Sequence, residues 1–245
     1  MKVVILAGGF GTRLSEYTKV VPKPMVKINK KPIILYIMEH FAKYGHKDFY
    51  IALGYKGQVI KKYFSKKILD WNVNLIDTGR NTMTGGRLKR VGELIKDDNF
   101  FMTYGDGLSD VDLNKLLKFH LKKKKLVSLT AVRPPARFGA LQINNEVVSY
   151  FKEKSKLDEN WINGGFFVMQ KKFLNFLTND KTILERRPLE KAAELKQLAA
   201  FKHGGFWQCM DTKKDKDTLT KILNKKSLEG SLILPYSLIL LIIHL

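Results

Sequence analysis

The stretch VVILAGGFGTRLSEYTKVVPKPM, residues 3–25, decides how this chain is expected to fold. It opens with an apolar run of strand length, Val3 to Ala7, and passes directly into Gly8, Gly9 and Gly11 before it reaches Arg13. A strand that ends in glycines lets a ligand approach bare backbone, whose N–H groups can hold anionic oxygens. Arg13 adds a planar, permanently charged fork that suits phosphate. The pattern therefore predicts a site for phosphate oxygens at the end of a buried strand.

This glycine loop matches neither of the two common phosphate-binding signatures. The P-loop pattern G-x-x-x-x-G-K-[ST] is absent, and the dinucleotide fingerprint needs a third glycine where Thr12 to Leu14 stand. Ten residues beyond Arg13, Lys23 lies between Pro22 and Pro24. Prolines fix their own φ and disfavour the α region for the residue before them, so we expect the Lys23 backbone to be extended and its ammonium to be aimed. A rigid surface loop with a solvated lysine is the alternative, and the neighbouring loop and Arg13 favour a second phosphate contact.

Beyond the opening strand, apolar runs of strand length recur at 49–53, 73–76, 100–104 and 126–132. Helical patterns lie between several of them, including one at 34–41 and one that we expect to begin near Ser109, where Ser109 and Asp112 fit a capping box. Strands that alternate with helices predict βαβ units and a mostly parallel sheet covered on both faces. After Pro134, three strand-like pieces follow one another, at 138–143, 146–153 and 163–170, and indicate an antiparallel interruption. Helical segments are expected near Leu189 and Leu219.

Composition agrees with one soluble, folded unit. The chain has 245 residues, of which 44% are hydrophobic and 27% charged, which is enough to bury a substantial core. Its single cysteine, Cys209, excludes an internal disulfide, and its first residues indicate a core strand rather than a signal peptide, so we expect a cytoplasmic protein. With no repeat and no linker, residues 1–226 are predicted to form a single domain, followed by a tail at 227–245.

The net charge of +21, from 44 Lys and Arg against 23 Asp and Glu, raises nucleic acid as a partner. Most of this charge is lysine scattered over the outer faces and ends of expected helices, without an arginine cluster or a basic stripe interleaved with aromatics. A solvated lysine-rich surface is the favoured interpretation, and nucleic-acid binding is not expected.

The tail SLILPYSLILLIIHL, residues 231–245, carries no Lys, Arg, Asp or Glu. A membrane span needs ~20 apolar residues. This stretch is shorter and contains Pro235, so a membrane anchor is not favoured. Packing against the body or a sister subunit, weak membrane association and an altered chain end all remain open interpretations.

Several motifs together resemble one family. G-G-x-G-T-R-L followed by P-K-P is similar to the signature of the sugar-1-phosphate nucleotidyltransferases. The later stretches DTGRNTMTGGRLKRV, FMTYGDGLSDVD, RFGALQI, FKEK, INGGFFV and GFWQCMDT resemble, in order, the branch that acts on CTP and glucose 1-phosphate. The resemblance runs from Lys2 to about Leu223. It implies a single-domain Rossmann-like three-layer α/β/α fold with a mostly parallel mixed sheet, and a homo-oligomer.

The implied reaction is the Mg²⁺-dependent transfer of a cytidylyl group from CTP to glucose 1-phosphate, which gives CDP-glucose and pyrophosphate. By the same resemblance, the metal ligands are Asp106, in YGDG, and Asp211, in WQCMDT. Two carboxylates with substrate oxygens and waters are a usual way to hold Mg²⁺. The structural alternatives are a turn residue at Asp106 and a helix N-cap at Asp211.

The resemblance also assigns the substrate contacts, with Arg13 and Lys23 counted as catalytic together with both aspartates. The triphosphate cradle is expected to be Leu6, Ala7, Gly8, Gly9, Phe10, Gly11, Thr12 and Arg13, and Lys23 is expected to contact the α-phosphate. Thr82, Arg87 and Gly105 are expected to help hold the nucleotide, and the sugar phosphate is expected to meet Glu153, Lys154, Asn163 and Gly164.

Two departures from the family pattern leave alternatives open. A short link, SKKILDWNVN at 65–74, stands where the cytidylyltransferase branch has a longer segment that helps complete the nucleotide site and subunit contacts. TTP or UTP therefore remains an alternative donor, as does a relative that binds nucleotide without turnover. Cys209 stands where the family has proline, and it is interpreted as a small buried residue rather than a nucleophile, since no histidine lies beside it.

Overall fold

The computed structural model describes residues 1–65, 70–134, 140–152 and 160–228. The strands are β1 Lys2–Leu6, β2 Lys27–Ile28, β3 Lys31–Pro32, β4 Asp48–Leu53, β5 Asn72–Asp77, β6 Asn99–Tyr104, β7 Gly107–Ser109, β8 Val127–Val132, β9 Ala140–Asn144, β10 Val147–Lys152, β11 Ile162–Gln170, β12 Leu198–His203 and β13 Trp207–Cys209. The α-helices are α1 Ser15–Thr18, α2 Ile33–Lys43, α3 Gly57–Phe64, α4 Thr84–Gly92, α5 Leu113–Lys123, α6 Arg187–Glu194 and α7 Lys213–Leu228. Three 3₁₀ turns complete the described elements: η1 Thr12–Leu14, η2 Lys23–Met25 and η3 Lys171–Phe176.

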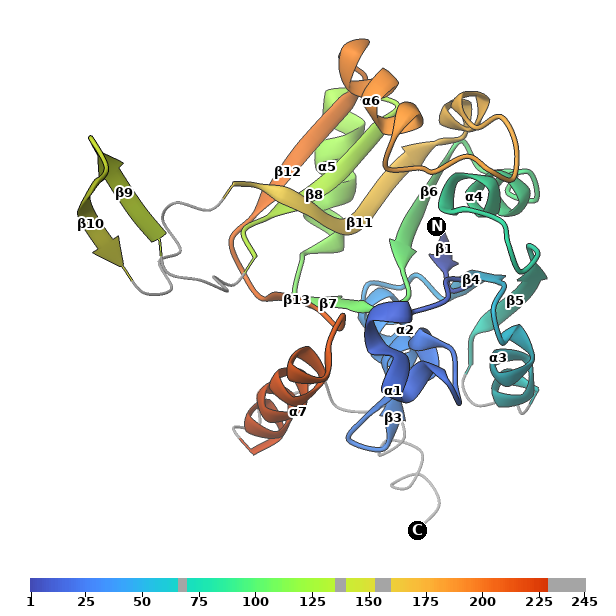
Figure 1. Cartoon of the computed structure of the whole chain (residues 1–245). Helices are drawn as coiled ribbons and strands as arrows, with labels where there is room; N and C mark the ends of the chain where they lie inside the picture. Colours follow the sequence, from blue (N-terminus) through green and yellow to red (C-terminus); the bar gives the residue numbers. More distant parts are fainter. Residues whose placement is uncertain (66–69, 135–139, 153–159, 229–245) are drawn as a thin grey trace.

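Within the described residues, the central sheet has seven strands in the order β12-β8-β11-β6-β1-β4-β5 (Figure 1). β1 pairs in parallel with β4 and β6, β4 with β5, and β8 with β12, while β11 runs antiparallel between β6 and β8. The predicted mixed, mostly parallel sheet is thus confirmed. At its carboxyl edge, Leu6 pairs with both Ala52 and Tyr104, so the loops after β1, β4 and β6 begin side by side.

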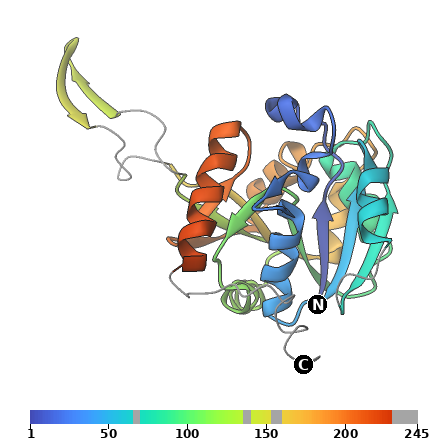
Figure 2. The same ribbon diagram turned by 90° about the horizontal axis from the view of Figure 1, so that it is seen from below.

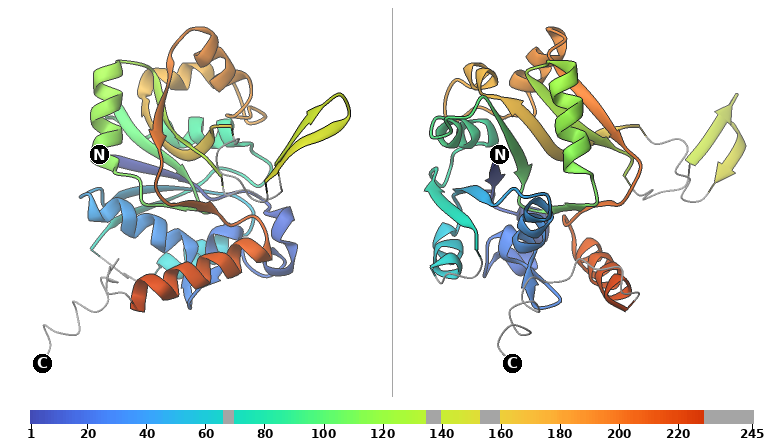
Figure 3. Two further views of the ribbon diagram at one scale, coloured as in Figure 1. Left: turned by 90° about the vertical axis from the view of Figure 1, so that its left-hand side faces the viewer. Right: turned by 180° about the vertical axis from the view of Figure 1, so that it is seen from behind.

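The two faces of the sheet carry separate hydrophobic clusters, which follow from the alternation of side chains along β1. Val3 and Ile5 pack in one cluster with residues of α2, α3, α5 and α7. Val4 and Leu6 pack in the other with residues of α4, α6 and η3. Helices therefore cover both faces, and the molecule has the predicted three layers (Figures 1 and 3).

β9 and β10 form an antiparallel hairpin that stands away from the body of the molecule (Figures 1 and 2). The register pairs Ile143 with Val148 and Leu141 with Phe151, and it shifts between Val148 and Tyr150. Leu141, Ile143, Val148 and Phe151 therefore share one face of the hairpin, and all four side chains are exposed. The predicted antiparallel interruption is confirmed in β9, β10 and β11.

The sequence placed one helix start incorrectly. α5 begins at Leu113 instead of Ser109, because Asp112 is the N-cap and its carboxylate accepts from Lys115 N at 2.9 Å. Ser109 belongs to β7, and its hydroxyl donates to the carbonyl of Phe206 at 2.9 Å. The pairing of β7 with β13 fixes Ser109 in a strand, so a local capping signal was overridden by a tertiary contact.

The predicted domain boundary at 226 falls within α7, which continues to Leu228, and the tail at 231–245 lies outside the described residues. In the part of the chain that the structure describes, no helix combines the length and the apolar character that crossing a bilayer requires.

Candidate active site

The glycine loop leaves the sheet at the carboxyl end of β1, in the position that the sequence predicted. Ala7 N donates to Ala52 O at 3.0 Å and Gly105 N donates to Leu6 O at 3.1 Å, so the chain on either side of β1 holds the start of the loop. Gly11 has φ +64°, and a Cβ there would lie 2.8 Å from the methyl group of Thr18. Glycine is therefore required at this position, and the loop then closes into the 3₁₀ turn η1 that carries Arg13.

Arg87 supports this loop from beneath. Its side chain is 3% exposed, and its guanidinium lies so close to Gly8 that a Cβ there would be 2.3 Å from a terminal nitrogen. The terminal nitrogens donate to oxygens of Gly8 (3.0 Å), Leu53 (2.9 Å), Thr78 (2.7 Å), Gly79 (2.7 Å) and Arg80 (3.1 Å). Arg87 thus ties the loop after β1 to the ends of β4 and β5. Its predicted contact with a nucleotide stays a prediction, and its observed partners are protein atoms.

The expectation of an extended backbone at Lys23 is wrong. Lys23 opens the 3₁₀ turn η2, in which Met25 N donates to Pro22 O at 2.8 Å and Val26 N donates to Lys23 O at 3.1 Å. These two hydrogen bonds outweigh the bias that Pro24 imposes, and Pro22 takes the extended conformation instead, at φ −66° and ψ 151°. The position of the Lys23 ammonium is nevertheless fixed, because it contacts Asp106 and Asp211 at the carboxyl edge of the sheet.

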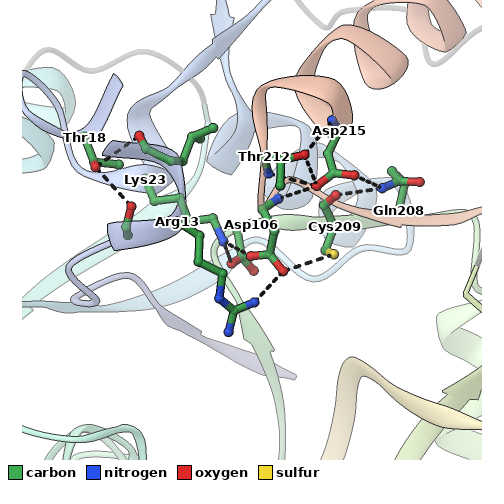
Figure 4. Close-up of polar contacts among 11 residues, drawn as sticks. Arg13, Thr18, Lys23, Asp106, Gln208, Cys209, Thr212 and Asp215 are labelled. Carbon is green, nitrogen blue, oxygen red and sulfur yellow. Dashed lines mark hydrogen bonds and ion pairs between the residues drawn. The ribbon is translucent and has the colours of Figure 1, made fainter. Parts of the chain in front are cut away.

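The predicted catalytic residues meet in a single cluster, in which Figure 4 labels Arg13, Lys23 and Asp106. Lys23 Nζ lies 2.6 Å from Asp106 Oδ2 and 2.6 Å from Asp211 Oδ1, and Arg13 lies 2.8 Å from Asp211 Oδ2. These residues come from η2, the turn between β6 and β7, the segment before α7, and η1. Residues 198 positions apart, Arg13 and Asp211, are therefore brought into contact by the fold.

The charges in this cluster reinforce one another. Burial would lower the pKa of Lys23, but the two carboxylates outweigh that effect and raise it above its usual value. Burial would likewise raise the pKa of Asp211, and the hydrogen bond and charge of Lys23, with Arg13, lower it instead. Lys23 and Asp211 are consequently both ionised at neutral pH. The cluster therefore holds opposite charges close together at the carboxyl edge of the sheet.

The structure decides between the two interpretations of Asp211. The N-cap of α7 is not Asp211 but Thr212, whose hydroxyl accepts from Asp215 N at 3.2 Å. Asp215 Oδ2 in return accepts from Thr212 N at 2.8 Å and from Asp211 N at 3.0 Å. This reciprocal capping box satisfies the start of the helix and leaves the Asp211 carboxylate to face Lys23.

Cys209 lies beside this cluster, with its sulfur 3.7 Å from Asp211 Oδ2. Burial, together with the nearby carboxylates, raises the pKa of its thiol to about 12. A thiol that stays protonated at neutral pH is a poor nucleophile, which agrees with the interpretation of Cys209 as a packing residue near the aspartates.

Two cavities adjoin at the cluster, and Arg13, Tyr104, Asp106 and Asp211 line both of them. The smaller cavity, of about 410 Å³, contains every predicted nucleotide residue: Leu6, Ala7, Gly8, Gly9, Phe10, Gly11, Thr12, Arg13, Lys23, Thr82, Arg87 and Gly105. The larger cavity, of about 1010 Å³, is lined by Asn163 and Gly164 among others. The two predicted aspartates thus lie where ligands in the two cavities would meet.

The predicted sugar residues are only partly placed. Asn163 Oδ1 accepts from Gly165 N at 2.9 Å, and Gly164 O accepts from the indole of Trp207 at 2.7 Å, so both residues are held at the cavity wall. Glu153 and Lys154 lie outside the described residues.

The side chains of the larger cavity that sequence reasoning missed include Tyr104, Glu185 and Trp207. Trp207 stands in the quoted motif GFWQCMDT, and Tyr104 in YGDG, so their places in these motifs could have indicated them. Glu185 lies in ILERRPLE, where no local pattern distinguishes it from the neighbouring charges. Only the tertiary structure brings it to the cavity.

A glycine loop, two cations and two carboxylates thus lie where two cavities adjoin. This arrangement suits the transfer of a phosphate-containing group between two phosphate-bearing substrates. The model of the nucleotidyl transferase family matches residues 2–214. The chain therefore belongs to the nucleotidyl transferases. Similar proteins include the glucose-1-phosphate cytidylyltransferase of Salmonella typhimurium, with 48% identity over 92% of this chain and 96% of that protein.

A further relative has a different sugar phosphate and nucleotide in its name, and a solved structure shares the fold. The D-glycero-alpha-D-manno-heptose 1-phosphate guanylyltransferase of Campylobacter jejuni is 33% identical over 82% of this chain and 90% of that protein. The crystal structure of HddC from Yersinia pseudotuberculosis superposes with a TM-score of 0.71 at 27% identity, and covers 91% of this chain and 99% of that one. Both the fold and the enzyme class predicted from sequence are confirmed.

Proposed function

We propose that the protein transfers a cytidylyl group from CTP to glucose 1-phosphate and so forms CDP-glucose and pyrophosphate. The observation that carries this proposal is the 48% identity to a glucose-1-phosphate cytidylyltransferase over nearly the whole of both chains. The site geometry agrees with it, since the glycine loop and the predicted sugar residues line adjoining cavities.

In this reaction an oxygen of the sugar phosphate attacks the α-phosphorus of CTP. One phosphorus–oxygen bond forms while the bond to pyrophosphate breaks in line, and the attacking phosphate oxygen is already deprotonated. The transition state gathers negative charge around the α-phosphorus, so catalysis depends on positioning and charge. Lys23 and Arg13 are the cations that contact the two aspartates, and Lys23 is held in place by both carboxylates.

Mg²⁺ is proposed as the cofactor, with Asp106 and Asp211 as its protein ligands. The donor chemistry fits, because carboxylate oxygens are the ligands that Mg²⁺ prefers and it usually takes only one or two of them. A single ammonium contacts both carboxylates at 2.6 Å, so the two groups are close enough to share one cation. No cluster of three or more His, Cys, Asp or Glu that could hold a metal occurs among the described residues, and substrate oxygens and waters would complete the shell. When bound, the ion would neutralise phosphate charge.

The reaction is tested by incubating the purified protein with glucose 1-phosphate, Mg²⁺ and each of CTP, TTP, UTP and GTP in turn. We expect pyrophosphate release with CTP at the highest kcat/KM. A higher kcat/KM with TTP or UTP would overturn the choice of base, and tight CTP binding by calorimetry without turnover would indicate a nucleotide-binding protein. No turnover with any nucleotide would remove the proposed reaction.

We also propose a homo-oligomer. The apolar face formed by Leu141, Ile143, Val148 and Phe151 supports it, since a lone two-stranded hairpin is marginally stable until its apolar face is covered. Size-exclusion chromatography with light scattering should give a mass above the 28.2 kDa of one chain. The double variant I143T/F151S should give a lower mass, whereas a monomeric wild type would contradict the proposal.

An expected absence and a location complete the proposed function. We expect no DNA or RNA binding near physiological salt, because the lysines are scattered, and a steeply salt-dependent affinity would contradict this expectation. The cytoplasm is the proposed site of action, since nucleoside triphosphates are supplied there.

A further inference from the structure

Glu185 is a carboxylate at the larger cavity whose contacts are all with neutral groups. It lies between η3 and α6, in a segment that passes close to the start of α4 and the end of β6. The hydroxyl of Tyr104 donates to Glu185 Oε1 at 2.5 Å, and the hydroxyl of Thr84 donates to Oε2 at 2.7 Å. Among the described residues, no Lys, Arg or His forms an ion pair with it.

The roles in these two hydrogen bonds are fixed. Burial, reinforced by the charge of Glu185, raises the pKa of Tyr104 well above its usual value, so the phenol keeps its proton and must donate. The Thr84 hydroxyl accepts from Leu184 N at 3.0 Å and therefore directs its own proton to the carboxylate. Each carboxylate oxygen has a second lone-pair direction, and Glu185 is exposed at the cavity wall, so it can accept further hydrogen bonds there.

The charges around the larger cavity determine which part of a ligand suits this carboxylate. Phosphate is drawn to the cations that line the two cavities, which include Arg13, Lys23 and Lys214, and is repelled by an unneutralised carboxylate. A neutral hydroxyl can donate to it. A sugar phosphate carries its anion at one end and hydroxyls on the rest of the ring, which matches a cavity with Arg13 at one part of its wall and Glu185 at another.

On these grounds, and resting on the proposed function, we propose that Glu185 accepts a hydrogen bond from a ring hydroxyl of the sugar 1-phosphate and contributes to sugar specificity. Tyr104 and Thr84 orient its carboxylate by occupying one lone-pair direction on each oxygen. Thr84 also lines the smaller cavity, where the nucleotide is proposed to bind, and Tyr104 lines both cavities. Glu185 is therefore held by residues that face the two proposed substrates.

The test compares kcat/KM for glucose 1-phosphate with that for its 2-, 3-, 4- and 6-deoxy analogues, in the wild type and in the E185A and E185Q variants. We expect the kcat/KM of the wild type to be lower by about 10-fold or more for at least one analogue, because a site built around a substrate hydroxyl discriminates against its loss. In E185A that penalty should fall to within about 3-fold, while KM for CTP changes little. E190Q, which changes an exposed carboxylate of α6, is the matched control and should retain wild-type discrimination.

A merely structural role for Glu185 gives a different result. E185A would then lower activity toward glucose 1-phosphate and every analogue by the same factor, and this outcome would overturn the proposal. Y104F and T84V remove the orienting hydroxyls but keep the carboxylate, so we expect them to retain the analogue penalty in part. Calorimetric titration of the wild type and E185A with the same five sugar phosphates gives a readout without turnover. If calorimetry shows sugar discrimination that depends on Glu185 but no turnover occurs, the proposed reaction alone is overturned. If neither kinetics nor calorimetry shows discrimination that depends on Glu185, the proposed role of Glu185 is overturned.

Discussion

At the scale of single residues, the site depends on Lys23, whose ammonium lies between two carboxylates. Its contacts with Asp106 and Asp211, each of 2.6 Å, fix a positive charge at the place where the two cavities adjoin. A charge held in advance requires no reorganisation when negative charge develops in the transition state, which is why such groups contribute more to kcat than to ground-state binding.

We therefore expect Lys23→Ala to lower kcat by about 10²-fold or more and to change KM for CTP far less. Steady-state kinetics of pyrophosphate release measures both quantities. Lys19→Ala, an exposed lysine four positions earlier, is the control and should behave as the wild type. An effect on KM alone would mean that Lys23 only anchors the nucleotide in the ground state.

Asp211→Asn should nearly abolish turnover while the fold remains intact. The amide keeps the size of the side chain but loses the negative charge that attracts Lys23, Arg13 and the proposed Mg²⁺. Turnover and the circular dichroism spectrum should be measured together, with Asp217→Asn, an exposed residue of α7, as the matched substitution. If Asp211→Asn kept most of its activity, the proposed metal role of Asp211 would be wrong.

At the scale of elements, helix caps and turns position the side chains that the site uses. The capping box of Thr212 and Asp215 starts α7 and also receives Asp211 N, so the beginning of this helix fixes the backbone of a site residue. Arg87 does the same for the glycine loop by binding the carbonyl of Gly8. We therefore expect stability and catalysis to be coupled at both places.

Thr212→Ala removes the N-cap hydroxyl and should lower the free energy of unfolding by about 1 kcal/mol. We also expect a several-fold loss of kcat, because the segment that carries Asp211 loses a restraint. Urea unfolding and steady-state kinetics provide the two measurements. Thr220→Ala removes a hydroxyl that bonds only back to Lys216 within the same helix, at 2.9 Å, and should leave kcat unchanged. Equal kinetic effects from both variants would argue against the coupling.

At the scale of the whole molecule, the folded state depends on histidines that stay neutral. Burial lowers the pKa of His40, His46 and His120 to about 4 each. His120 shows how the fold accommodates a neutral ring, since its nitrogens lie 2.9 Å from Ser128 Oγ and 3.1 Å from Asn99 Oδ1.

This predicts a loss of stability in mild acid. Between pH 6.5 and about 4 the unfolded chain binds protons at these rings and the folded chain does not, so the free energy of unfolding falls as the pH falls. Each ring should contribute on the order of 1–3 kcal/mol by pH 4. Urea unfolding at pH 7 and pH 5 measures the fall, and His46→Gln should reduce it. A free energy of unfolding that stays constant over this range would contradict the prediction.

The sequence by itself determined the alternation of strands and helices, because apolar periodicity is local and the inner strands β1, β4 and β6 are largely buried on both faces. It also determined the glycine loop and, through the resemblance of ordered motifs, most of the residues that line the smaller cavity. Local rules failed at two places: at Lys23 the hydrogen bonds of a 3₁₀ turn overrode a proline bias, and at Ser109 a tertiary contact overrode a capping signal.

The tertiary structure alone decided which distant side chains meet. The contact between Arg13 and Asp211 requires the carboxyl edge of the sheet to bring the first loop against the start of the last described helix. Glu185 reaches the cavity only because its segment packs against α4 and β6, and its surrounding sequence has no pattern that indicates this position. Contacts between residues so far apart depend on how whole elements pack against one another, and no local spacing in the chain encodes that packing.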